Sequence, residues 1–149
     1  MLPVGGVFAG RFEIDRLAGK GGMGYVYRAF DRERTDWVAL KVLHVDSLRD
    51  RDHFDREARV LAELSHPNIV AYVAHGVAED GQHFVAMEWL VGDDLDERMK
   101  RAKLPLDATI DLVEKLAAGL AAAHARGVIH RDLKPSNLFS STASSARRS

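Results

Sequence analysis

Cysteine is absent from the sequence, and aromatic residues make up only 7% of it. Without cysteine the chain can form neither disulfide bonds nor thiolate metal sites, which fits a cytoplasmic protein. The chain also has no large excess of positive or negative charge, because it contains 21 basic and 22 acidic residues. A basic surface that would bind nucleic acid or an anionic membrane is therefore not expected.

Long apolar segments are missing as well. No run approaches the roughly 20 residues that a membrane-spanning helix needs, so we expect no membrane segment. The start of the chain lacks the basic region and the unbroken apolar stretch of a signal peptide. Together these absences predict a cytoplasmic protein.

Hydrophobic periodicity divides the chain into strands followed by helices. Five segments have the composition of strands, and they lie at residues 12–17, 25–30, 37–43, 69–77 and 84–90. Helical spacing occurs at about residues 48–64, then at 95–103 and from Pro105 to about Gly127. Five strands with one inserted helix, followed by further helices, indicate the α+β class.

The composition changes abruptly after Phe139. Five of the ten residues from Ser140 to Ser149 are serine, and none is aromatic or a large aliphatic residue. Such a segment buries too little apolar surface to offset the entropy of ordering it, so we expect a disordered tail. The predicted organisation is an N-terminal extension over residues 1–11, one domain over 12–139 and the tail over 140–149.

A glycine cluster separates the first two predicted strands. Gly19, Gly21 and Gly24 recur with the spacing Gly-x-Gly-x-x-Gly, and Val26 follows in the next strand. Glycine suits a loop whose backbone N–H groups approach phosphate closely or whose φ angles are positive. The alternative is a glycine-rich hairpin turn without a ligand, which is common. A dinucleotide-binding fold is disfavoured, because its loop is followed by a helix rather than a strand.

The third predicted strand carries a lysine two residues after an alanine. Strand alternation places Ala39 and Lys41 on the same face, where the small residue leaves room for a flat ring and the ammonium group can reach phosphate oxygens. Glu57 lies on the inward edge of the next predicted helix, and a buried lysine needs such a partner. The alternatives are an edge-strand lysine held in water and a solvated glutamate.

The segment His130 to Asn137 is the hardest to explain without chemistry. Asp132 can accept a hydrogen bond from a substrate hydroxyl, and Lys134 can neutralise a transferring phosphoryl group. Asn137 offers a neutral oxygen to Mg²⁺. Any one of these residues could be an ordinary loop residue, but the complete octapeptide is very improbable by chance.

These motifs occur together, in order, from about residue 12 to residue 139. The chain therefore resembles the serine/threonine protein kinases and is similar to the eukaryotic-like kinases of bacteria. The resemblance implies a kinase-like fold, with a five-stranded antiparallel N-terminal lobe and its helix over about 12–91. The first helices and the catalytic loop of the C-terminal lobe would follow over about 92–139. It also implies transfer of the γ-phosphoryl of ATP, with Mg²⁺, to serine or threonine hydroxyls of a protein substrate.

The resemblance gives a role to each matching residue. Asp132 would be the catalytic base, Lys134 would contact the phosphate and Asn137 would bind Mg²⁺. Lys41 would hold the α- and β-phosphates and pair with Glu57. The residues implied to contact the nucleotide are Gly19, Lys20, Gly21, Gly22, Gly24, Val26, Ala39, Lys41, Met87, Glu88, Leu90, Asp94 and Phe139.

Four of these nucleotide contacts have particular positions in the family. Met87 matches the gatekeeper, and the segment Glu88 to Leu90 matches the hinge, whose backbone hydrogen-bonds adenine. Asp94 matches the residue that contacts the ribose. Phe139 matches the residue that forms the floor under adenine.

The family continues with Asp-Phe-Gly, which supplies a Mg²⁺ ligand, and this motif does not occur in the sequence. Three hypotheses follow: an active serine/threonine kinase, a kinase-like module that binds nucleotide or a partner kinase without catalysis, and a kinase truncated by a frameshift near Phe139. Later helices of the family would cover the helix at residues 105–126. Without them its apolar face is expected to be exposed, and a partner protein could cover it.

Overall fold

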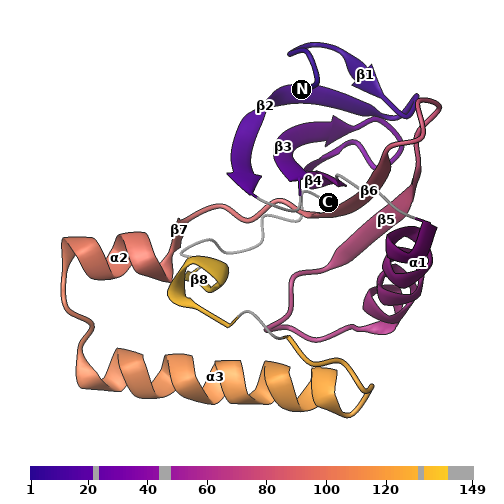
Figure 1. Cartoon of the computed structure of the whole chain (residues 1–149). Coiled ribbons are helices and arrows are strands. Elements are labelled where there is room, and N and C mark those ends of the chain that lie inside the picture. The colour runs from indigo at the N-terminus through magenta and orange to yellow at the C-terminus, as the bar shows by residue number, and fades with distance from the viewer. Residues whose placement is uncertain (22–23, 44–47, 131–132, 141–149) are drawn as a thin grey trace. The chain divides into compact units, whose positions relative to one another are not determined.

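The computed structural model describes residues 1–21, 24–43, 48–130 and 133–140, with the backbone alone at residues 48–51, 53 and 57 (Figure 1). It divides into two compact units. The first unit contains Met1–Ser65 and Val70–Trp89, and the second contains His66–Ile69 and Leu90–Ser149. Each unit is described separately.

The first unit is an antiparallel sheet with one helix, α1 (Leu48–Glu63), which lies against β5 (Figure 1). The strand order is β1-β2-β3-β4-β6-β5. The strands are β1 (Val7–Phe8), β2 (Phe12–Gly21), β3 (Gly24–Asp31), β4 (Asp36–Leu43), β5 (Tyr72–Val77) and β6 (His83–Glu88). The predicted α+β class and antiparallel sheet are thus confirmed.

The predicted count of five strands is wrong, because the sheet has six. The added strand is β1, which pairs with β2 through Val7 opposite Glu13 and Phe8 opposite Phe12. Two residues are too few to show alternation, so the periodicity of the sequence could not reveal them. The fourth predicted strand begins at Tyr72 rather than at residue 69.

Alternating side chains of the strands form the core of the first unit. Phe12, Tyr27 and Leu40 are almost completely buried. The ring of Phe84 packs edge-on against Phe8 and Phe12, with centroid distances of 5.5 and 5.4 Å. These contacts bring β6 against the N-terminal strands β1 and β2, which it does not pair with in the sheet. The curled sheet therefore encloses its own core.

A buried ion pair fixes the chain where β2 begins and β3 ends. The Nε and Nη2 atoms of Arg11 donate to Oδ1 and Oδ2 of Asp31 at 2.8 and 2.7 Å. The Asp31 side chain is completely buried, and its Oδ1 also accepts from the backbone N–H of Glu33 at 3.0 Å. These hydrogen bonds, that from Arg11 foremost, hold the pKa of Asp31 below its usual range.

The second unit contains helices α2 (Leu95–Arg101) and α3 (Leu106–His124), the 3-10 helix η1 (Pro135–Asn137) and a two-stranded ladder of β7 (Asp93–Asp94) with β8 (Phe139–Ser140). Ser140, which the sequence places in the tail, is therefore paired. The remainder of that tail lies outside the described residues. No helix in the described parts combines the length and the apolar character needed to cross a membrane.

Residues 66–69 belong with α3 rather than with the strand that follows them. The Nδ2 atom of Asn68 donates to the backbone oxygen of Lys115 at 2.9 Å. A Cβ atom at Gly119 would lie 3.3 Å from the Asn68 backbone oxygen, so a small residue suits this close approach. On α3, the side chains of Leu106, Ile110 and Val113 are exposed, whereas those of Leu116 and Leu120 are half-buried, so the predicted exposure of the apolar face is partial.

Candidate functional site

The glycine cluster lies in the hairpin of β2 and β3. Gly19 is opposite Val26, Lys20 is opposite Tyr25 and Gly21 is opposite Gly24. Gly22, one of the predicted contacts, lies outside the described residues. The ammonium group of Lys20 is 5.8 Å from the centroid of the Tyr25 ring, at the outer range of a cation–π contact.

The glycines of this hairpin are required for different reasons. At Gly24, φ is +143° and a Cβ atom would lie 2.0 Å from the backbone oxygen of Val42 on the neighbouring strand. Gly24 is therefore needed for the fold itself. A Cβ atom at Gly21 would meet no described atom within 4 Å. The backbone at Gly21 thus faces open space, which fits a loop that a phosphate can approach.

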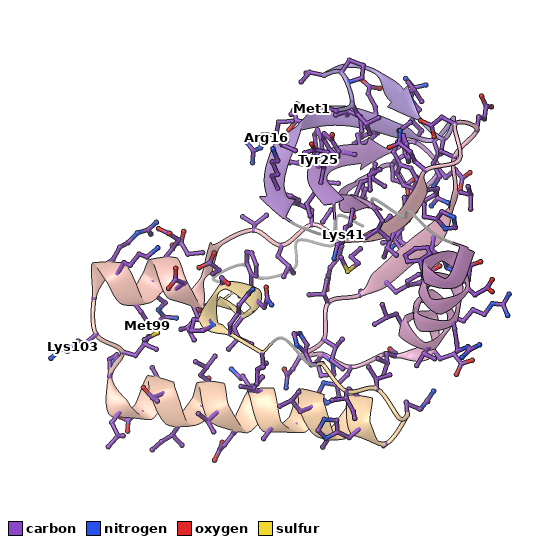
Figure 2. The ribbon with its side chains drawn as sticks, in the orientation of Figure 1. Met1, Arg16, Tyr25, Lys41, Met99 and Lys103 are labelled. Carbon is purple, nitrogen blue, oxygen red and sulfur yellow. The ribbon has the colours of Figure 1, made fainter. Side chains whose placement is uncertain are left out.

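One face of the sheet collects four of the predicted nucleotide contacts. Val26 on β3 is directly opposite Lys41 on β4, and Ala39 on β4 is directly opposite Met87 on β6. Directly opposed residues of antiparallel strands share a face, and so do Ala39 and Lys41, two positions apart. Lys41 projects from this face (Figure 2). The sheet therefore places a small residue and a lysine on one face, as the sequence predicts, and adds the gatekeeper candidate Met87 beside them.

Glu57 lies in α1, on the part of the helix whose backbone alone is described. The predicted pair of Lys41 and Glu57 therefore stays a prediction. α1 lies against β5, the strand next to β6, so the helix belongs to the same unit as Lys41.

The end of β6 is held by hydrogen bonds to the residue before β5. The backbone N–H of Glu88 donates to the Ala71 oxygen at 2.9 Å, and the Ala71 N–H donates to Oε1 of Glu88 at 2.7 Å. Glu88 is the first residue of the predicted hinge. Its main chain and its side chain thus bind the same partner, which fixes the point at which the chain leaves the sheet.

In the second unit, Asp94 and Phe139 lie directly opposite each other in the β7–β8 ladder, although 45 positions separate them. Oδ1 of Asp94 also accepts from the backbone N–H of Glu97 at 2.8 Å and so caps α2. The backbone N–H of Leu95 donates to the Leu138 oxygen at 2.7 Å. The structure thereby joins the two predicted contacts to ribose and adenine in one short ladder.

The predicted catalytic loop runs into η1. Lys134 precedes this 3-10 turn with extended backbone, and its oxygen accepts from the Asn137 N–H at 2.9 Å. The side chains of Lys134 and Asn137 are both exposed. Asp132 lies outside the described residues, so its predicted role as catalytic base stays a prediction. Among the described residues, no group of three or more His, Cys, Asp or Glu side chains is placed to hold a metal ion.

Sequence reasoning missed the contact of two arginines with the predicted hinge. Trp89 follows Glu88, and the guanidinium carbons of Arg16 and Arg28 lie 5.8 and 5.7 Å from the centroid of its ring. Nothing in the spacing of these residues signals the contact, because β2, β3 and the segment after β6 meet only in the folded sheet.

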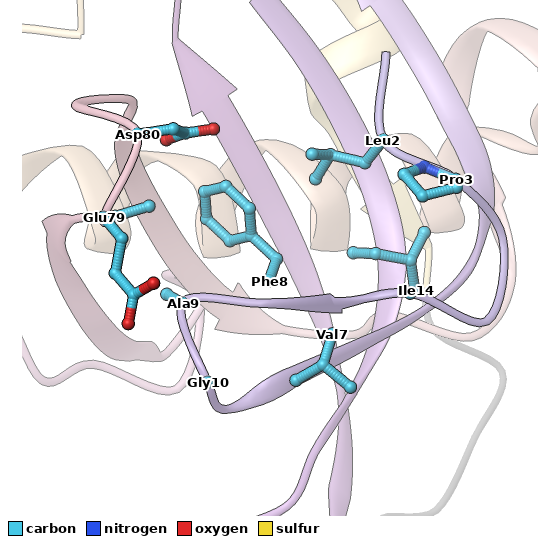
Figure 3. Close-up of a pocket in the computed structure, with 11 residues that line it drawn as sticks. Leu2, Pro3, Val7, Phe8, Ala9, Gly10, Ile14, Glu79 and Asp80 are labelled. Atoms are coloured by element: carbon cyan, nitrogen blue, oxygen red, sulfur yellow. The ribbon is translucent and has the colours of Figure 1, made fainter.

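A pocket of about 250 Å³ lies elsewhere in the first unit, between the N-terminal residues 2–10 and the turn that joins β5 and β6 (Figure 3). Leu2, Phe8 and Ile14 form apolar walls, and Glu79 and Asp80 approach it from the turn between β5 and β6. No residue predicted to bind nucleotide lines this pocket. It is therefore distinct from the candidate site.

Residues 12–147 match the protein kinase domain family, and the chain belongs to this family. It is 40% identical over 141 residues to the serine/threonine-protein kinase pkn3 of Myxococcus xanthus, covering 91% of this chain and 26% of pkn3. It is 41% identical over 145 residues to PknJ of Mycobacterium tuberculosis, covering 95% of this chain and 24% of PknJ. The chain thus spans about a quarter of the length of these curated relatives.

A solved structure agrees with this assignment. The crystal structure of the PknI kinase domain of Mycobacterium tuberculosis matches with a TM-score of 0.83 and 34% identity, covering 95% of this chain and 59% of that domain. The predicted resemblance to bacterial serine/threonine kinases is confirmed. The matched region corresponds to part of a kinase domain.

Proposed function

We propose that this chain binds ATP with Mg²⁺ and belongs to a cytoplasmic enzyme that phosphorylates serine or threonine hydroxyls of a protein substrate. The observation that carries the proposal is the shared face of β3, β4 and β6, which holds Val26, Ala39, Lys41 and Met87. A small residue beside a lysine leaves room for a flat ring next to a phosphate-binding cation. The membership of the family supplies the class of reaction.

The residues present fit the parts of this substrate. The open space at Gly21 allows backbone N–H groups to approach phosphate oxygens. Lys41 would bind the α- and β-phosphates as a point charge. In the second unit, Asp94 and Phe139 would contact the ribose and the adenine, and their direct pairing keeps those two contacts together. Glu88 and Leu90 would contribute backbone groups to adenine.

In the transfer step, the substrate hydroxyl oxygen would form a bond to the γ-phosphorus while the bond from this phosphorus to the β–γ bridging oxygen of ATP breaks. Asp132 would orient the hydroxyl and accept its proton, and ADP would leave. Lys134 would neutralise charge on the transferring group, and Asn137 would be a ligand of Mg²⁺. Bound Mg²⁺ would offset the negative charge of the phosphates.

Nucleotide binding is the part of the proposal that the chain can test directly. A ligand present at about 100 times its Kd stabilises a protein by about 2.7 kcal/mol, so saturating MgATP should raise the Tm clearly. Lys41→Met should abolish this rise, whereas Lys103→Met, which removes an exposed lysine between α2 and α3, should preserve it. An unchanged Tm of the wild-type chain with saturating MgATP would contradict nucleotide binding.

A second candidate function is nucleotide binding without transfer. The described residues include the face that holds Val26, Ala39, Lys41 and Met87 but not Asp132, so they support nucleotide binding more directly than transfer. The test is transfer of radiolabelled phosphate to a generic protein substrate, with Asp132→Asn as the control. Transfer that depends on Asp132 would support the kinase activity of these residues and exclude the second candidate.

A further inference from the structure

Arg16 on β2 and Arg28 on β3 lie directly opposite each other in the sheet. Like charges in this position repel, so the pair is unfavourable without compensating contacts. The Nη1 atom of Arg28 donates to Oδ2 of Asp15 at 3.0 Å. The ring of Trp89 supplies a second compensating contact, because the two guanidinium carbons lie 5.8 and 5.7 Å from its centroid, at the outer range of a cation–π contact.

The contacts continue through Arg28 to a second tryptophan. The guanidinium carbon of Arg28 lies 3.8 Å from the centroid of the Trp37 ring, and Trp37 packs edge-on against Phe30 at 5.4 Å. Cations and rings thus alternate in a row formed by Arg16, Trp89, Arg28, Trp37 and Phe30. We refer to this set as the arginine–tryptophan row.

The sheet residues of the row, Arg16, Arg28, Phe30 and Trp37, share the face that carries the predicted nucleotide contacts. Arg28 is directly opposite Ala39, and Ala39 is directly opposite Met87. Trp89 comes two positions after Met87, beyond the last pair of the β4–β6 ladder, Val38 with Glu88. Trp89 is therefore held to β2 and β3 by its side chain, although β6 pairs with neither strand. Arg16 projects from β2 (Figure 2).

We infer that Arg16 and Arg28 are positioning residues that hold Trp89 and thereby fix the hinge segment from which adenine is bound. The inference rests on the proposed nucleotide binding. Hydrogen bonds to Ala71 fix Glu88 on one side of this segment, and the two cation–π contacts fix Trp89 on the other. A hinge held in place before the ligand arrives loses less conformational entropy when it binds.

The test uses the fact that the chain has only two tryptophans, Trp37 and Trp89. In a Trp37→Phe background, Trp89 is the sole tryptophan and reports on itself. Arg16→Gln removes an exposed cation. Quenching of Trp89 emission by acrylamide, which is uncharged and so insensitive to the lost charge, should increase in this variant without nucleotide. The Kd for MgATP should rise about two- to fivefold, the loss expected for one exposed cation–π contact.

Two further variants separate positioning from a general effect on the sheet. Arg16→Lys keeps a cation, so it should restore both the quenching and the Kd of the parent. Arg32→Gln is the matched control, because it removes an exposed ion pair between β2 and the residue that follows β3, that of Arg32 with Glu13 at 3.0 Å. It should leave both quantities unchanged. Melting curves confirm that each variant is folded.

The outcomes also separate this inference from the proposed function. ATP binding by the parent with unchanged quenching and unchanged Kd in Arg16→Gln would overturn the inference alone. Equal effects of Arg16→Gln and Arg32→Gln would overturn it too, because the loss would then belong to the β2–β3 pair in general. If the parent fails to bind ATP, the proposed function is contradicted, and so is the part of the inference that concerns adenine binding. The acrylamide quenching then still tests whether Arg16 holds Trp89.

Discussion

The glycine-rich hairpin allows a prediction in which two similar substitutions have opposite consequences. Gly24→Ala should destabilise the fold, and Gly21→Ala should weaken nucleotide binding in a stable protein. At Gly24 an added Cβ atom meets backbone of the neighbouring strand, with the Val42 oxygen at 2.0 Å and the Leu43 Cα at 3.0 Å. At Gly21 it meets no described atom within 4 Å.

The magnitudes follow from these geometries. The φ angle of +143° at Gly24 is one that L-residues rarely adopt, which costs about 1–3 kcal/mol for alanine. The contact with the Val42 oxygen requires β4 to shift, and overpacking of this kind costs about another 1–3 kcal/mol. A loss of about 2–6 kcal/mol is a large part of the roughly 5–15 kcal/mol that stabilises a typical domain. Gly21→Ala should instead stabilise slightly, by about 0.4–1 kcal/mol, because it restricts the unfolded chain.

Thermal melts with and without MgATP test both halves of this prediction. The Tm of Gly24→Ala should fall by roughly 8 °C or more, since each kcal/mol corresponds to about 4–8 °C in a small domain. Gly21→Ala should raise the Tm without ligand by roughly 2–8 °C and show a smaller further rise with MgATP. Equal Tm values for the two variants would refute the structural reasoning at Gly24. A full MgATP-dependent rise in Gly21→Ala would refute the role of the open backbone at Gly21.

Two further predictions concern the buried ion pair and the exposed helix. Arg11→Gln should cost about 2–4 kcal/mol at pH 7, toward the low end for a buried pair, because Asp31 keeps the Glu33 N–H. Because the pKa of Asp31 is lowered in the folded state, its ionised carboxylate stabilises the fold above about pH 4. This stabilisation is lost as the pH falls through the pKa of Asp31 in the folded state. The difference in Tm between Arg11→Gln and the wild type should therefore be smaller at pH 3 than at pH 7. On α3, Ile110→Glu with Val113→Glu should reduce self-association in light scattering while changing the Tm little, because both side chains are exposed. A fully retained gap at pH 3, or unchanged association, would contradict these expectations.

Local patterns predicted most of the first unit correctly. Alternation placed Ala39 and Lys41 on one face because side chains two positions apart on a strand lie on the same face of the sheet. It could not identify β1, which has two residues, or show that Gly24 is required by β4 rather than by a ligand. The sequence motif gives no reason to distinguish its three glycines. In the structure they differ, because a side chain at Gly24 would clash with β4 and a side chain at Gly21 would not.

Contacts between segments that are distant in the sequence could not be predicted from the sequence alone. The pairing of Asp94 with Phe139 depends on a ladder whose two strands lie on either side of both helices of the second unit in the sequence. The arginine–tryptophan row depends on β2, β3 and the segment after β6 meeting in the sheet. Resemblance to the family supplied roles for Asp94 and Phe139 and placed Trp89 in the hinge segment, but it gave no role to Arg16 or Arg28.

The two units assemble their shares of the predicted nucleotide contacts independently. The register of β3, β4 and β6 fixes Lys41 and its neighbours, and the β7–β8 ladder fixes Asp94 and Phe139. Each set is held by hydrogen bonds internal to its own unit, so a substitution in one set should leave the geometry of the other intact. Losses at Lys41 and at Asp94 should therefore add in the binding free energy of ATP, provided that the nucleotide, which both residues would contact, does not couple them. Strong non-additivity would show that the bound nucleotide couples the two sets.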